Sequence, residues 1–414
     1  MLSFNHIVFK QILNTYKSSF SGLAKETWLL SAVMLLNRCG SMAVPFMGLY
    51  ITQNMHRSAT DAGLIITLFG LGAVSGSLVG GKLTDLFGFR LVQITSAILA
   101  GLFFLIFPAV EDFSLLCVLS VVISFFSDAF RPANFTAIAY YAKPGTVTRS
   151  YSLNRLATNI GWSFGISLAG IIASLNYHLL FLVEGSVLIL VGLSISILLK
   201  EKPVTEKPER INAEVPHPVK PWKDTFYIKF IFVTTLLVTC AFLMFRVMPV
   251  FLKEQWRINE FQIGLIMGLN GAVIALFEMI LIGKIEQRRS AVFFITVGAT
   301  CIAVSYLLFT ISAQFHLAIA IAGMLVFTIG EMFALPFINT IIVKRSNDQN
   351  RGMYAAGYSL SWSLAQVIGP LGGFYLANLL GYNMLWYCRA LLLVLSAYGF
   401  SRLGKQSGIQ TRKI

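Results

Sequence analysis

The sequence predicts an all-α membrane protein whose twelve transmembrane helices form two related six-helix bundles. Three observations lead to this prediction. The chain has 414 residues, of which 56% are hydrophobic and only 12% are charged, and its mean hydropathy is +0.74. Apolar runs of about 20 residues, the length that crosses a bilayer as a helix, recur along the whole chain. Features of the first half also return in the second half. Alternating barrel strands of about ten residues would not give such runs, which excludes a β-barrel.

The apolar runs divide the chain into two sets of six spans. The first set covers residues 28–51, 62–82, 91–110, 114–141, 150–173 and 178–199. The second set covers residues 231–252, 262–283, 291–311, 316–343, 353–378 and 383–402. We therefore expect an N-terminal bundle over 28–199, a C-terminal bundle over 231–402 and a basic tail over 403–414.

Two further segments lie outside the predicted bundles. In residues 1–27, apolar side chains recur every fourth position, at Phe4, Val8, Ile12, Tyr16 and Phe20. This pattern predicts an amphipathic helix on the membrane surface. The stretch lacks the apolar core and small-residue cleavage site of a signal peptide. Residues 200–230 are rich in proline and charge, which predicts a linker that packs no core of its own.

The placement of charge predicts the orientation of the chain. The net charge is +14, which by itself would also fit a nucleic-acid-binding protein. If the N-terminus is cytoplasmic, however, only Arg57, Lys253 and Arg257 of the 32 Lys and Arg fall in outer loops. Such a bias is typical of membrane proteins and predicts a multi-pass protein of the inner membrane with both termini in the cytoplasm. We expect a monomer in the lipid bilayer and no nucleic-acid partner.

No sequence pattern indicates an enzyme or a cofactor. All five cysteines fall inside predicted spans and lack the spacing of disulfide frameworks or zinc sites. The chain contains no phosphate-binding loop, no nucleophile elbow and no HExxH helix. We therefore expect neither a metal nor a cofactor.

The two halves match at an offset of about 203 residues. Six helices, a linker and six related helices predict two bundles related by an axis along the membrane normal, with a binding site between them at mid-depth. Four matches in order support this: Gly63–Lys82 with Gly264–Lys284, Arg149–Tyr151 with Arg351–Tyr354, Asp128 with Glu331, and Leu175–Tyr177 with Leu380–Tyr382. The last match places Glu184 opposite Arg389.

A glycine-rich second span leads into a short charged loop. Gly72, Gly76 and Gly80 form a flat helix face that lets a neighbouring helix approach closely. The loop then contains Gly81, Asp85, Gly88 and Arg90. The two loop glycines permit a tight connection, Asp85 can accept hydrogen bonds from backbone N–H groups at a helix start, and Arg90 supplies a partner charge.

This loop, with the two-half organisation, closely resembles the major facilitator superfamily, and the resemblance covers nearly the whole chain. The family's loop reads G-x-L-x-D-x-x-G-x-R and holds the cytoplasmic side shut when the transporter faces outward. The resemblance implies this gating role for Gly81, Asp85, Gly88 and Arg90. The equivalent segment of the second half, residues 283–289, is degenerate, so we expect a weaker gate there.

Glycines in the fifth and eleventh spans resemble the helix-bending motif of the family's drug:H+ antiporters. Gly161 and Gly165 lie in the fifth span, which lacks the Gly-Pro pair of that motif. The pair is found instead at Gly369 and Pro370 of the eleventh span, followed by Gly373. We expect these residues to bend or closely pack their helices, and the departure in the fifth span leaves the direction of transport open.

Ionisable residues inside the spans are the candidate functional residues, because a charge at mid-membrane costs roughly 2.5–3.5 kcal/mol. Asp128 and Arg131 share one face of the fourth span, just before a proline, and Glu331 lies before a proline in the tenth. The others are Asn37 and Arg38 in the first span, Arg246 in the seventh and Glu278 in the eighth. The resemblance implies that spans 1, 4, 7 and 10 line the central cavity.

We expect protonation of a buried acid to release its arginine and so to bias the equilibrium between the two bundles. The alternative is that pairs such as Asp128–Arg131 and Glu184–Arg389 are static ion pairs that lock helices together. We favour this static interpretation for Glu184, Arg389 and Arg155, which lie nearer the span ends.

Our leading hypothesis is a proton-coupled secondary transporter that exports amphiphilic organic compounds, since aromatic side chains are abundant enough to line an apolar cavity. The alternative is an importer or uniporter of an anionic solute such as a peptide, a carboxylate or an iron chelate. Its support is the surplus of arginines, Arg38, Arg131 and Arg246, over cavity acids. A membrane sensor or scaffold with the same fold is a third possibility, which has little need of a full set of buried charges.

Overall fold

The computed structural model of the protein describes residues 21–199, 221–285, 288–311, 315–345 and 351–406. Within these ranges the chain folds into helices joined by short turns. Twelve of these helices are long and apolar enough to cross a membrane, which confirms the predicted spans. The predicted amphipathic helix near the N-terminus, most of the predicted linker and the end of the basic tail lie outside the described residues.

The N-terminal bundle begins with an interrupted span. This span consists of α2 (Lys25–Gly40), α3 (Ala43–Leu49) and the π-helical turn η1 (Tyr50–Asn54). Five further spans follow: α4 (Ala59–Phe87), α5 (Phe89–Ile106), α6 (Phe113–Tyr141), α7 (Val147–Leu175) and α8 (Tyr177–Leu198). The 3₁₀ turn η2 (Phe107–Ala109) extends α5. Side chains of Ser58, Asp112 and Asn176 accept backbone N–H groups where α4, α6 and α8 begin, as helix-capping chemistry requires.

The C-terminal bundle repeats this pattern, including the interruption. A 3₁₀ turn, η3 (Pro221–Lys223), precedes α9 (Thr225–Met244) and α10 (Met248–Glu254), which together make the seventh span. The start of α9 lies within the predicted linker, before its expected end. The remaining spans are α11 (Glu260–Ile285), α12 (Ala291–Leu308), α13 (His316–Arg345), α14 (Arg351–Leu380) and α15 (Tyr382–Gln406).

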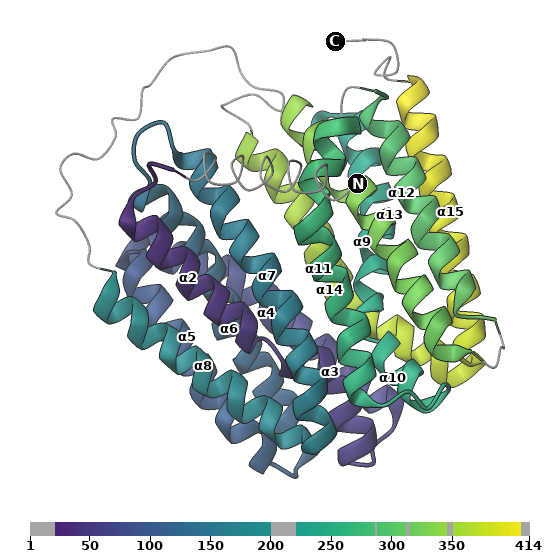
Figure 1. Ribbon diagram of the computed structural model, residues 1–414, viewed down its shortest axis with the longest axis horizontal. Coiled ribbons are helices and arrows are strands. Elements are labelled where there is room, and N and C mark those ends of the chain that lie inside the picture. The colour runs from purple at the N-terminus through teal and green to yellow at the C-terminus, as the bar shows by residue number, and fades with distance from the viewer. Residues whose placement is uncertain (1–20, 200–220, 286–287, 312–314, 346–350, 407–414) are drawn as a thin grey trace, which may run out of the picture.

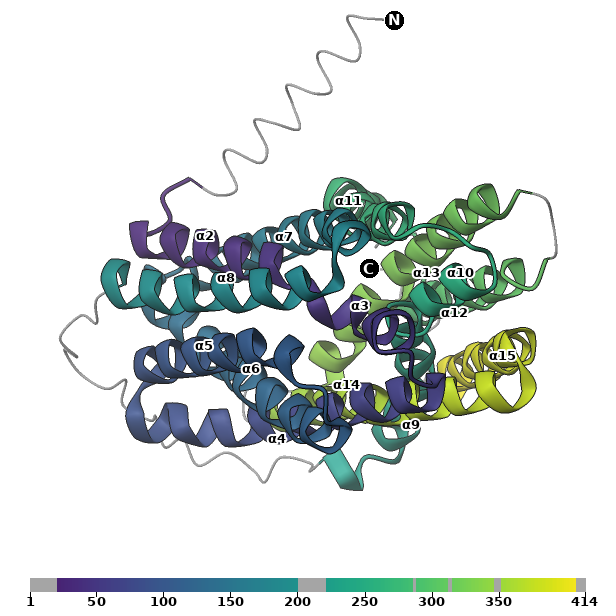
Figure 2. The same cartoon turned by 90° about the horizontal axis from the view of Figure 1, so that it is seen from below.

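The two bundles lie side by side (Figures 1 and 2). We call the end with the start of α2, the end of α8, the start of α9 and the end of α15 the terminal face, and the opposite end the loop face. The short helices α3 and α10 lie at the loop face, where the two bundles approach each other (Figure 1). The breaks within the first and seventh spans were not predicted from the sequence.

Glycines set the packing of α4 against α6. A Cβ atom at Gly72 would lie 2.0 Å from Ser124 Oγ, and one at Gly76 would lie 2.1 Å from the carbonyl oxygen of Phe125. At Gly80 the closest atom is the Cα of Ala129, at 2.6 Å. Only glycine fits at these positions, so the flat face predicted for the second span is the face that meets the fourth span.

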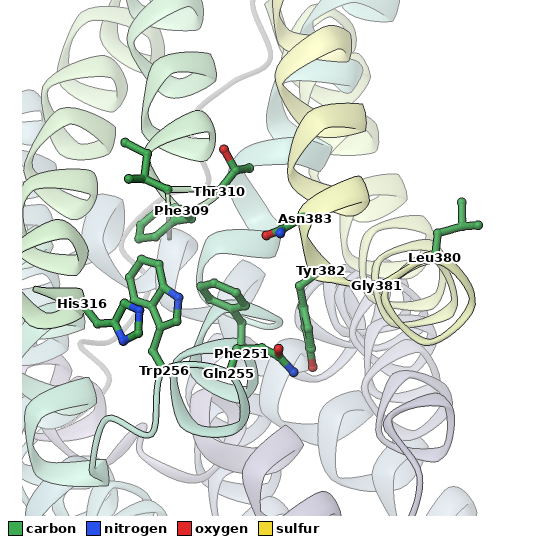
Figure 3. Close-up of a pocket in the computed structure, with 11 residues that line it drawn as sticks. Phe251, Gln255, Trp256, Phe309, Thr310, His316, Leu380, Gly381, Tyr382 and Asn383 are labelled. Carbon is green, nitrogen blue, oxygen red and sulfur yellow. The ribbon is translucent and has the colours of Figure 1, made fainter. Parts of the chain in front are cut away.

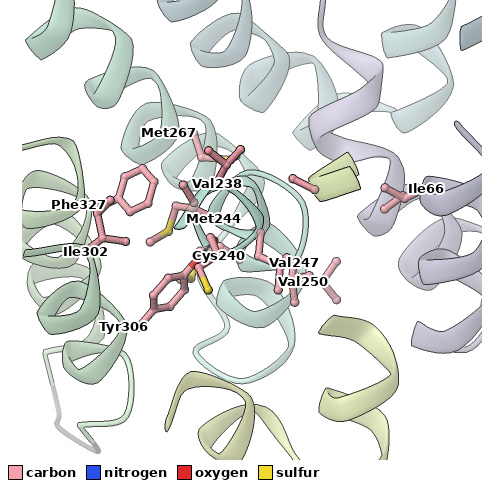
Figure 4. Close-up of a cluster of buried hydrophobic side chains, with 14 of the residues drawn as sticks. Ile66, Val238, Cys240, Met244, Val247, Val250, Met267, Ile302, Tyr306 and Phe327 are labelled. Atoms are coloured by element: carbon pink, nitrogen blue, oxygen red, sulfur yellow. Dashed lines mark hydrogen bonds between the residues drawn. The ribbon is translucent and has the colours of Figure 1, made fainter. Parts of the chain in front are cut away.

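The C-terminal bundle contains a dense apolar core between α9, α12 and α13 (Figure 4). Val238, Met244 and Phe327 are fully buried there, and van der Waals packing between such side chains holds the membrane-spanning helices together. The hydroxyl of Tyr306 donates a hydrogen bond to the carbonyl oxygen of Cys240 at 2.5 Å. This pairing satisfies a buried phenol and ties α12 to α9.

Hydrogen bonds join the two bundles at the loop face. Tyr177 Oη donates to Glu260 Oε1 at 2.5 Å, and Asn378 Nδ2 donates to Thr60 Oγ1 at 2.9 Å. Beside them, Lys253 Nζ lies 2.8 Å from the same Glu260 oxygen. The loop face is therefore the closed end of the molecule.

The two seams between the bundles differ in length. Along α7 and α11, contacts run from Gly170 against Gly264 to the Arg155–Glu278 ion pair. Along α4 and α14, close contacts run from Gly63 against Phe374 only as far as Gly70 against Gln366. Beyond Gly70 a groove of about 640 Å³ separates the two helices on the terminal side.

Candidate functional site

The break in the first span is held by an acid from another helix. Ser41 and Met42 separate α2 from α3, so the backbone N–H groups at the start of α3 have no intrahelical acceptor. Glu184 of α8 supplies one: its Oε2 accepts the N–H of Met42 at 3.0 Å and that of Ala43 at 2.7 Å. Glu184 is 5% exposed. Its carboxylate therefore replaces the missing helical hydrogen bonds inside the membrane.

This arrangement corrects the sequence interpretation of Glu184. We expected Glu184 to pair with Arg389, its counterpart in the second half. Instead, Arg389 of α15 is buried with its Nε lacking a hydrogen-bond partner, and its Nη2 lies 3.8 Å from the Cβ position of Gly372. The two residues are equivalent positions of the two bundles, and equivalence across a repeat does not bring side chains into contact.

The break in the seventh span is closed by its own backbone. Between α9 and α10, the N–H groups of Arg246 and Val247 both donate to the carbonyl oxygen of Leu243, at 3.1 and 2.9 Å. No side chain is needed to cap the turn. The guanidinium of Arg246 lies over the ring of Phe242, 4.9 Å from its centroid, which is a cation–π arrangement.

Charges of both bundles act on one another between the two breaks. Asp128 of α6 is 7% exposed and forms a 2.7 Å ion pair with Arg131, as predicted from their spacing. Asp128, Arg131 and Glu184 all interact electrostatically with Arg38 of α2 and with Arg246. The group therefore joins four residues of the N-terminal bundle to one of the C-terminal bundle.

Two arginines in this group keep buried donors without acceptors. Arg38 Nε and Arg246 Nη1 are buried and have no hydrogen-bond partner. Arg131, in contrast, has a side chain that is 54% exposed. Asn37 lies beside Arg38 and is half-buried; its backbone carbonyl accepts the hydroxyl of Ser41 at 3.2 Å. Unpaired buried guanidinium donors are costly, so a bound anion or ordered water would stabilise them.

Glu331 lies apart from this group, within the C-terminal bundle. It accepts a hydrogen bond from Asn270 Nδ2 of α11 at 2.8 Å, and the same amide donates to Thr328 at 3.1 Å. Glu331 is half-buried in α13, which continues past Pro336 without ending. Its counterpart Asp128 has an arginine partner, whereas Glu331 has an amide.

Glu278 forms an ion pair between the bundles. Its Oε1 lies 2.5 Å from Nη2 of Arg155, which belongs to α7. The side chain of Arg155 is 57% exposed and that of Glu278 is 12% exposed. The pair bridges the α7–α11 seam on its terminal side, a role that the sequence spacing could not reveal.

The glycines of the fifth and eleventh spans pack against the two broken spans. A Cβ atom at Gly161 would lie 2.6 Å from the carbonyl oxygen of Leu35, and one at Gly165 would lie 2.6 Å from that of Arg38. Gly369 and Gly373 face Leu243 at 2.8 and 2.7 Å. Close packing is thus observed at these four glycines, and α14 continues through Pro370.

The loop after the second span is organised differently from expectation. Gly88 has a φ of +83°, a conformation that glycine adopts without strain, and it separates α4 from α5. Arg90 donates to the carbonyl oxygens of Ser196 and Leu199 at the end of α8, each at 2.6 Å. Asp85 is exposed, and within the described residues no hydrogen bond to its side chain is found. Gly81 is open, with Pro132 4.0 Å from its Cβ position.

A cluster of polar side chains at the terminal face was not predicted from the sequence. Asp224 caps α9, and Arg345 at the end of α13 binds it through Nε at 2.5 Å and Nη2 at 2.7 Å. Tyr354 of α14 donates to the same carboxylate at 2.9 Å, and the Tyr227 hydroxyl donates to the carbonyl of Tyr354. Three helices are thereby fixed to one acid.

The contacts of Asp224 and Tyr354 determine the protonation states of these two side chains. Burial acts to raise the pKa of Asp224, but the hydrogen bonds from Arg345, the Tyr227 backbone and Tyr354 outweigh it, so that this pKa is lowered. Burial and the Asp224 carboxylate raise the pKa of Tyr354 to about 12. The carboxylate therefore stays charged and the phenol neutral across the physiological range.

Two cavities lie away from the buried charges. The first, of about 420 Å³, opens at the loop face of the C-terminal bundle (Figure 3). Phe251, Trp256, Phe309 and Tyr382 line it, and Trp256 stacks on His316 with ring centroids 4.9 Å apart. It contains none of the predicted site residues. The second is the 640 Å³ groove between α4, α9 and α14.

The described residues contain no group of three or more His, Cys, Asp or Glu that could hold a metal ion. All five cysteines are free thiols. Among the charged side chains between the bundles, the acids can exchange protons and the arginines can bind anionic groups.

Comparison with solved structures identifies the same architecture. A bacterial homologue of the human lysosomal transporter Spinster, in an inward-facing and occupied conformation, superposes with a TM-score of 0.78 at 14% identity, covering 94% of this chain and 98% of that chain. The nucleoside transporter NupG gives a TM-score of 0.76 at 14% identity over 92% of this chain and 99% of that chain. A POT family transporter in complex with 5-aminolevulinic acid gives 0.77 at 14% identity, covering 94% and 97%.

Sequence comparison finds relatives of similar length. The Bacillus subtilis (strain 168) protein YqjV, described as an uncharacterized MFS-type transporter, is 24% identical over 380 residues, which is 90% of this chain and 92% of YqjV. A Na(+), Li(+), K(+)/H(+) antiporter of Planococcus maritimus is 24% identical over 366 residues, covering 80% and 84% of the two chains. The family model described as Major Facilitator Superfamily matches residues 29–370. The chain therefore belongs to the Major Facilitator Superfamily of secondary transporters.

Proposed function

We propose that this transporter couples the movement of protons to the export of amphiphilic organic compounds, by rocking the two bundles about the interface between them. The observation that carries the proposal is the set of interacting charges shared by both bundles. Asp128, Arg131, Arg38 and Glu184 of the N-terminal bundle act electrostatically on Arg246 of the C-terminal bundle. Any rocking motion changes these distances, and so changes the cost of keeping each acid charged.

We assign proton coupling first to Asp128 of the N-terminal bundle. Its only ion-pair partner within the described residues is Arg131, at 2.7 Å. Protonation of Asp128 would release Arg131, whose side chain is exposed enough to reorient. We assign the equivalent role in the C-terminal bundle to Glu331, which has an amide partner and no cation. The Planococcus maritimus relative is named as an antiporter that exchanges protons, which supports proton coupling here.

The groove between α4 and α14 supports an amphiphilic substrate. Leu78, Ile231 and Leu360 give it an apolar wall, while Ser77 and Ser363 add hydroxyl groups. The groove lies between membrane spans near their terminal ends, beside Trp222, and an interfacial position of this kind suits a molecule with both an apolar and a polar part. If the termini are cytoplasmic, as the positive-inside bias predicts, the groove faces the inner leaflet.

Flux measurements in proteoliposomes test proton coupling. We expect an imposed pH gradient to drive concentrative movement of an amphiphilic dye and to acidify or alkalinise the lumen in parallel. Unchanged flux after collapse of the gradient would refute proton coupling. Sodium and potassium ions should be included as candidate substrates, and exchange of these ions in place of the dye would overturn the amphiphile assignment.

The Asp128→Asn variant tests the assigned residue. We expect it to fold and to bind substrate but to lose at least about tenfold in gradient-driven accumulation, because asparagine cannot bind and release a proton. Glu111→Gln, which replaces an exposed acid of the same bundle outside its helices, is the matched control and should retain accumulation. Normal accumulation by Asp128→Asn would remove Asp128 from the mechanism.

A second candidate function is transport of an anionic solute. The observation that favours it is the pair of buried donors, Arg38 Nε and Arg246 Nη1, that lack acceptors. A carboxylate or phosphate of a substrate would satisfy such donors with charge-assisted hydrogen bonds. If Arg38→Gln abolishes binding of organic acids in a thermal-shift screen while dye binding persists, the anionic function is the better assignment.

A further inference from the structure

We infer that Glu184 is a proton-binding residue that couples the bend of the first span to the opening of the loop face. The inference rests on the proposed proton coupling and adds a second acid to it, at a position where the sequence indicated only a static pair. It depends on three interactions: the hydrogen bonds of Glu184 with the break, the contact of α3 with the other bundle, and the electrostatic interaction of Arg246 with Glu184.

A single carboxylate oxygen holds the break. Oε2 of Glu184 accepts both orphan N–H groups at the start of α3, from Met42 and Ala43. A charged carboxylate forms stronger hydrogen bonds with N–H donors than a neutral carboxylic acid does. Pro45, two residues after Ala43, has no N–H group of its own to add. The geometry of the break therefore depends on the charge of one side chain.

The short helix α3 connects the break to the C-terminal bundle. It packs against the junction of α9 and α10: a Cβ atom at Gly48 would lie 2.9 Å from Val250 Cγ2 and 3.6 Å from the carbonyl oxygen of Arg246. This contact belongs to the closed loop face. A change in the direction of α3 relative to α2 must therefore change the contact between the bundles at that face.

The charges around Glu184 make its proton affinity depend on conformation. The charged side chains that act on Glu184 are Arg38, from α2 of its own bundle, and Arg246, from the opposite bundle. Asp128 and Arg131 act on both arginines in turn. When the loop face opens, Arg246 moves away with its bundle, and the loss of a nearby positive charge favours protonation of Glu184.

Together these contacts give a linked cycle. With the loop face closed, Glu184 is charged, holds Met42 and Ala43, and interacts with Arg246. With the loop face open, Glu184 takes up a proton from that side. Closure brings Arg246 back and displaces the proton. By linkage, the state with the higher proton affinity is the one that acidic pH must favour, so low pH should open the loop face.

The experiment measures the distance between the bundles at the loop face. Glu111→Cys and Asn383→Cys, both exposed positions at that face, carry spin labels in a background without native cysteines, and pulsed electron paramagnetic resonance records their separation in nanodiscs between mildly acidic and mildly alkaline pH. We expect the longer separation to gain population at low pH. The Glu184→Gln variant keeps an oxygen acceptor for the break but cannot titrate, and we expect its distances to be independent of pH.

Two further variants keep the inference falsifiable. Glu184→Asp retains a titratable group and should restore the pH dependence. Arg246→Gln removes the positive charge whose distance from Glu184 changes with conformation, so most of the pH-dependent change in separation should be lost; it decides the matter if Glu184→Gln does not fold. A pH-dependent distance change that persists unaltered in both Glu184→Gln and Arg246→Gln would overturn the inference.

The outcome for Glu184 is separable from that of the proposed function. If wild-type protein shows gradient-driven flux and Glu184→Gln keeps the full pH response, proton coupling stands and this inference fails. If the wild type shows no gradient-driven flux but its pH response depends on Glu184, the residue controls the conformation and the proposed function fails.

Discussion

The first and seventh spans occupy equivalent positions in the two bundles and break at equivalent places, yet they are anchored differently. Pro45 and Pro249 follow the two breaks at matching positions. The first span has no side-chain cap at its start, and it is held at its break by Glu184. The seventh span closes its break with its own carbonyl and is held at its start by the Asp224 cluster.

This difference teaches where each bundle can respond to charge. In the N-terminal bundle, the hydrogen bonds of the broken span depend on an acid buried inside the membrane. In the C-terminal bundle, the acid that fixes the span lies at the terminal face, where Arg345 and Tyr354 keep it charged. We therefore expect the geometry of the first span to depend on the protonation of Glu184, and that of the seventh span to stay the same.

The strongest way to break this comparison is to remove the acid from the first break. Glu184→Ala leaves two buried N–H groups without an acceptor, and we expect a loss of about 3 kcal/mol of folding free energy. Unfolding of the purified protein in detergent measures it. Glu184→Gln, which retains an acceptor, is the control and should lose less than half as much. An alanine variant as stable as the wild type would show that water or another group caps the break equally well.

Gly161 of α7 and Gly369 of α14 test how tightly a neighbouring helix packs against each of the two broken spans. Gly161→Ala places a methyl group 2.6 Å from the backbone oxygen of Leu35, which cannot move without shifting α2. Gly369→Ala meets the flexible Leu243 side chain at 2.8 Å instead. We expect Gly161→Ala to cost about 2 kcal/mol and Gly369→Ala less than about 1 kcal/mol in unfolding experiments. Equal losses of stability would mean that the backbone at Leu35 and the side chain of Leu243 adjust equally easily to the added methyl group.

The dependence of stability on pH tests the role of Asp224 at the start of the seventh span. Asp224→Asn should lower stability at neutral pH by about 1–2 kcal/mol, because it removes charge-assisted hydrogen bonds from Arg345. The pKa of Asp224 is lowered in the folded protein, so its contribution is present above the ordinary aspartate pKa of about 3.9 and is lost as pH falls through the folded value. The unfolding curves of wild type and variant should therefore converge below about pH 4.

The smallest effect is expected at Arg389, the counterpart of Glu184. Its buried Nε has no partner, so replacing the guanidinium with an apolar side chain leaves no acceptor unsatisfied. Arg389→Leu should change stability by less than about 1 kcal/mol, in either direction. A large loss, comparable to that of Glu184→Ala, would indicate that the C-terminal bundle also depends on this position.

Most of the fold could be predicted because membrane spans are encoded locally. Each apolar run carries its own length and boundary signals, and the spacing of Asp128 and Arg131 correctly predicted their ion pair. The packing face formed by Gly72, Gly76 and Gly80 was also readable, since only the spacing of small residues matters there.

The rest of the site depends on contacts between distant segments. The breaks fall inside continuous apolar runs, although the matching prolines, Pro45 and Pro249, were a usable signal. Glu184 meets Met42 across 142 positions of the chain, and the repeat pointed to Arg389 instead. Arg90 binds carbonyl oxygens at the end of α8, and the backbone acceptors of a distant helix end cannot be identified from sequence.

The unequal seams have a consequence for the geometry of transport. On α7 the contacts reach from Gly170 to Arg155, about 22 Å along the helix. On α4 they reach from Thr60 to Gly70, about 15 Å. Two bodies joined further along one flank than the other do not swing symmetrically. If the bundles rotate as we propose, we expect the rotation axis to lie nearer the longer flank, so that the entrance widens on the α4–α14 side and admits cargo from the bilayer as well as from water.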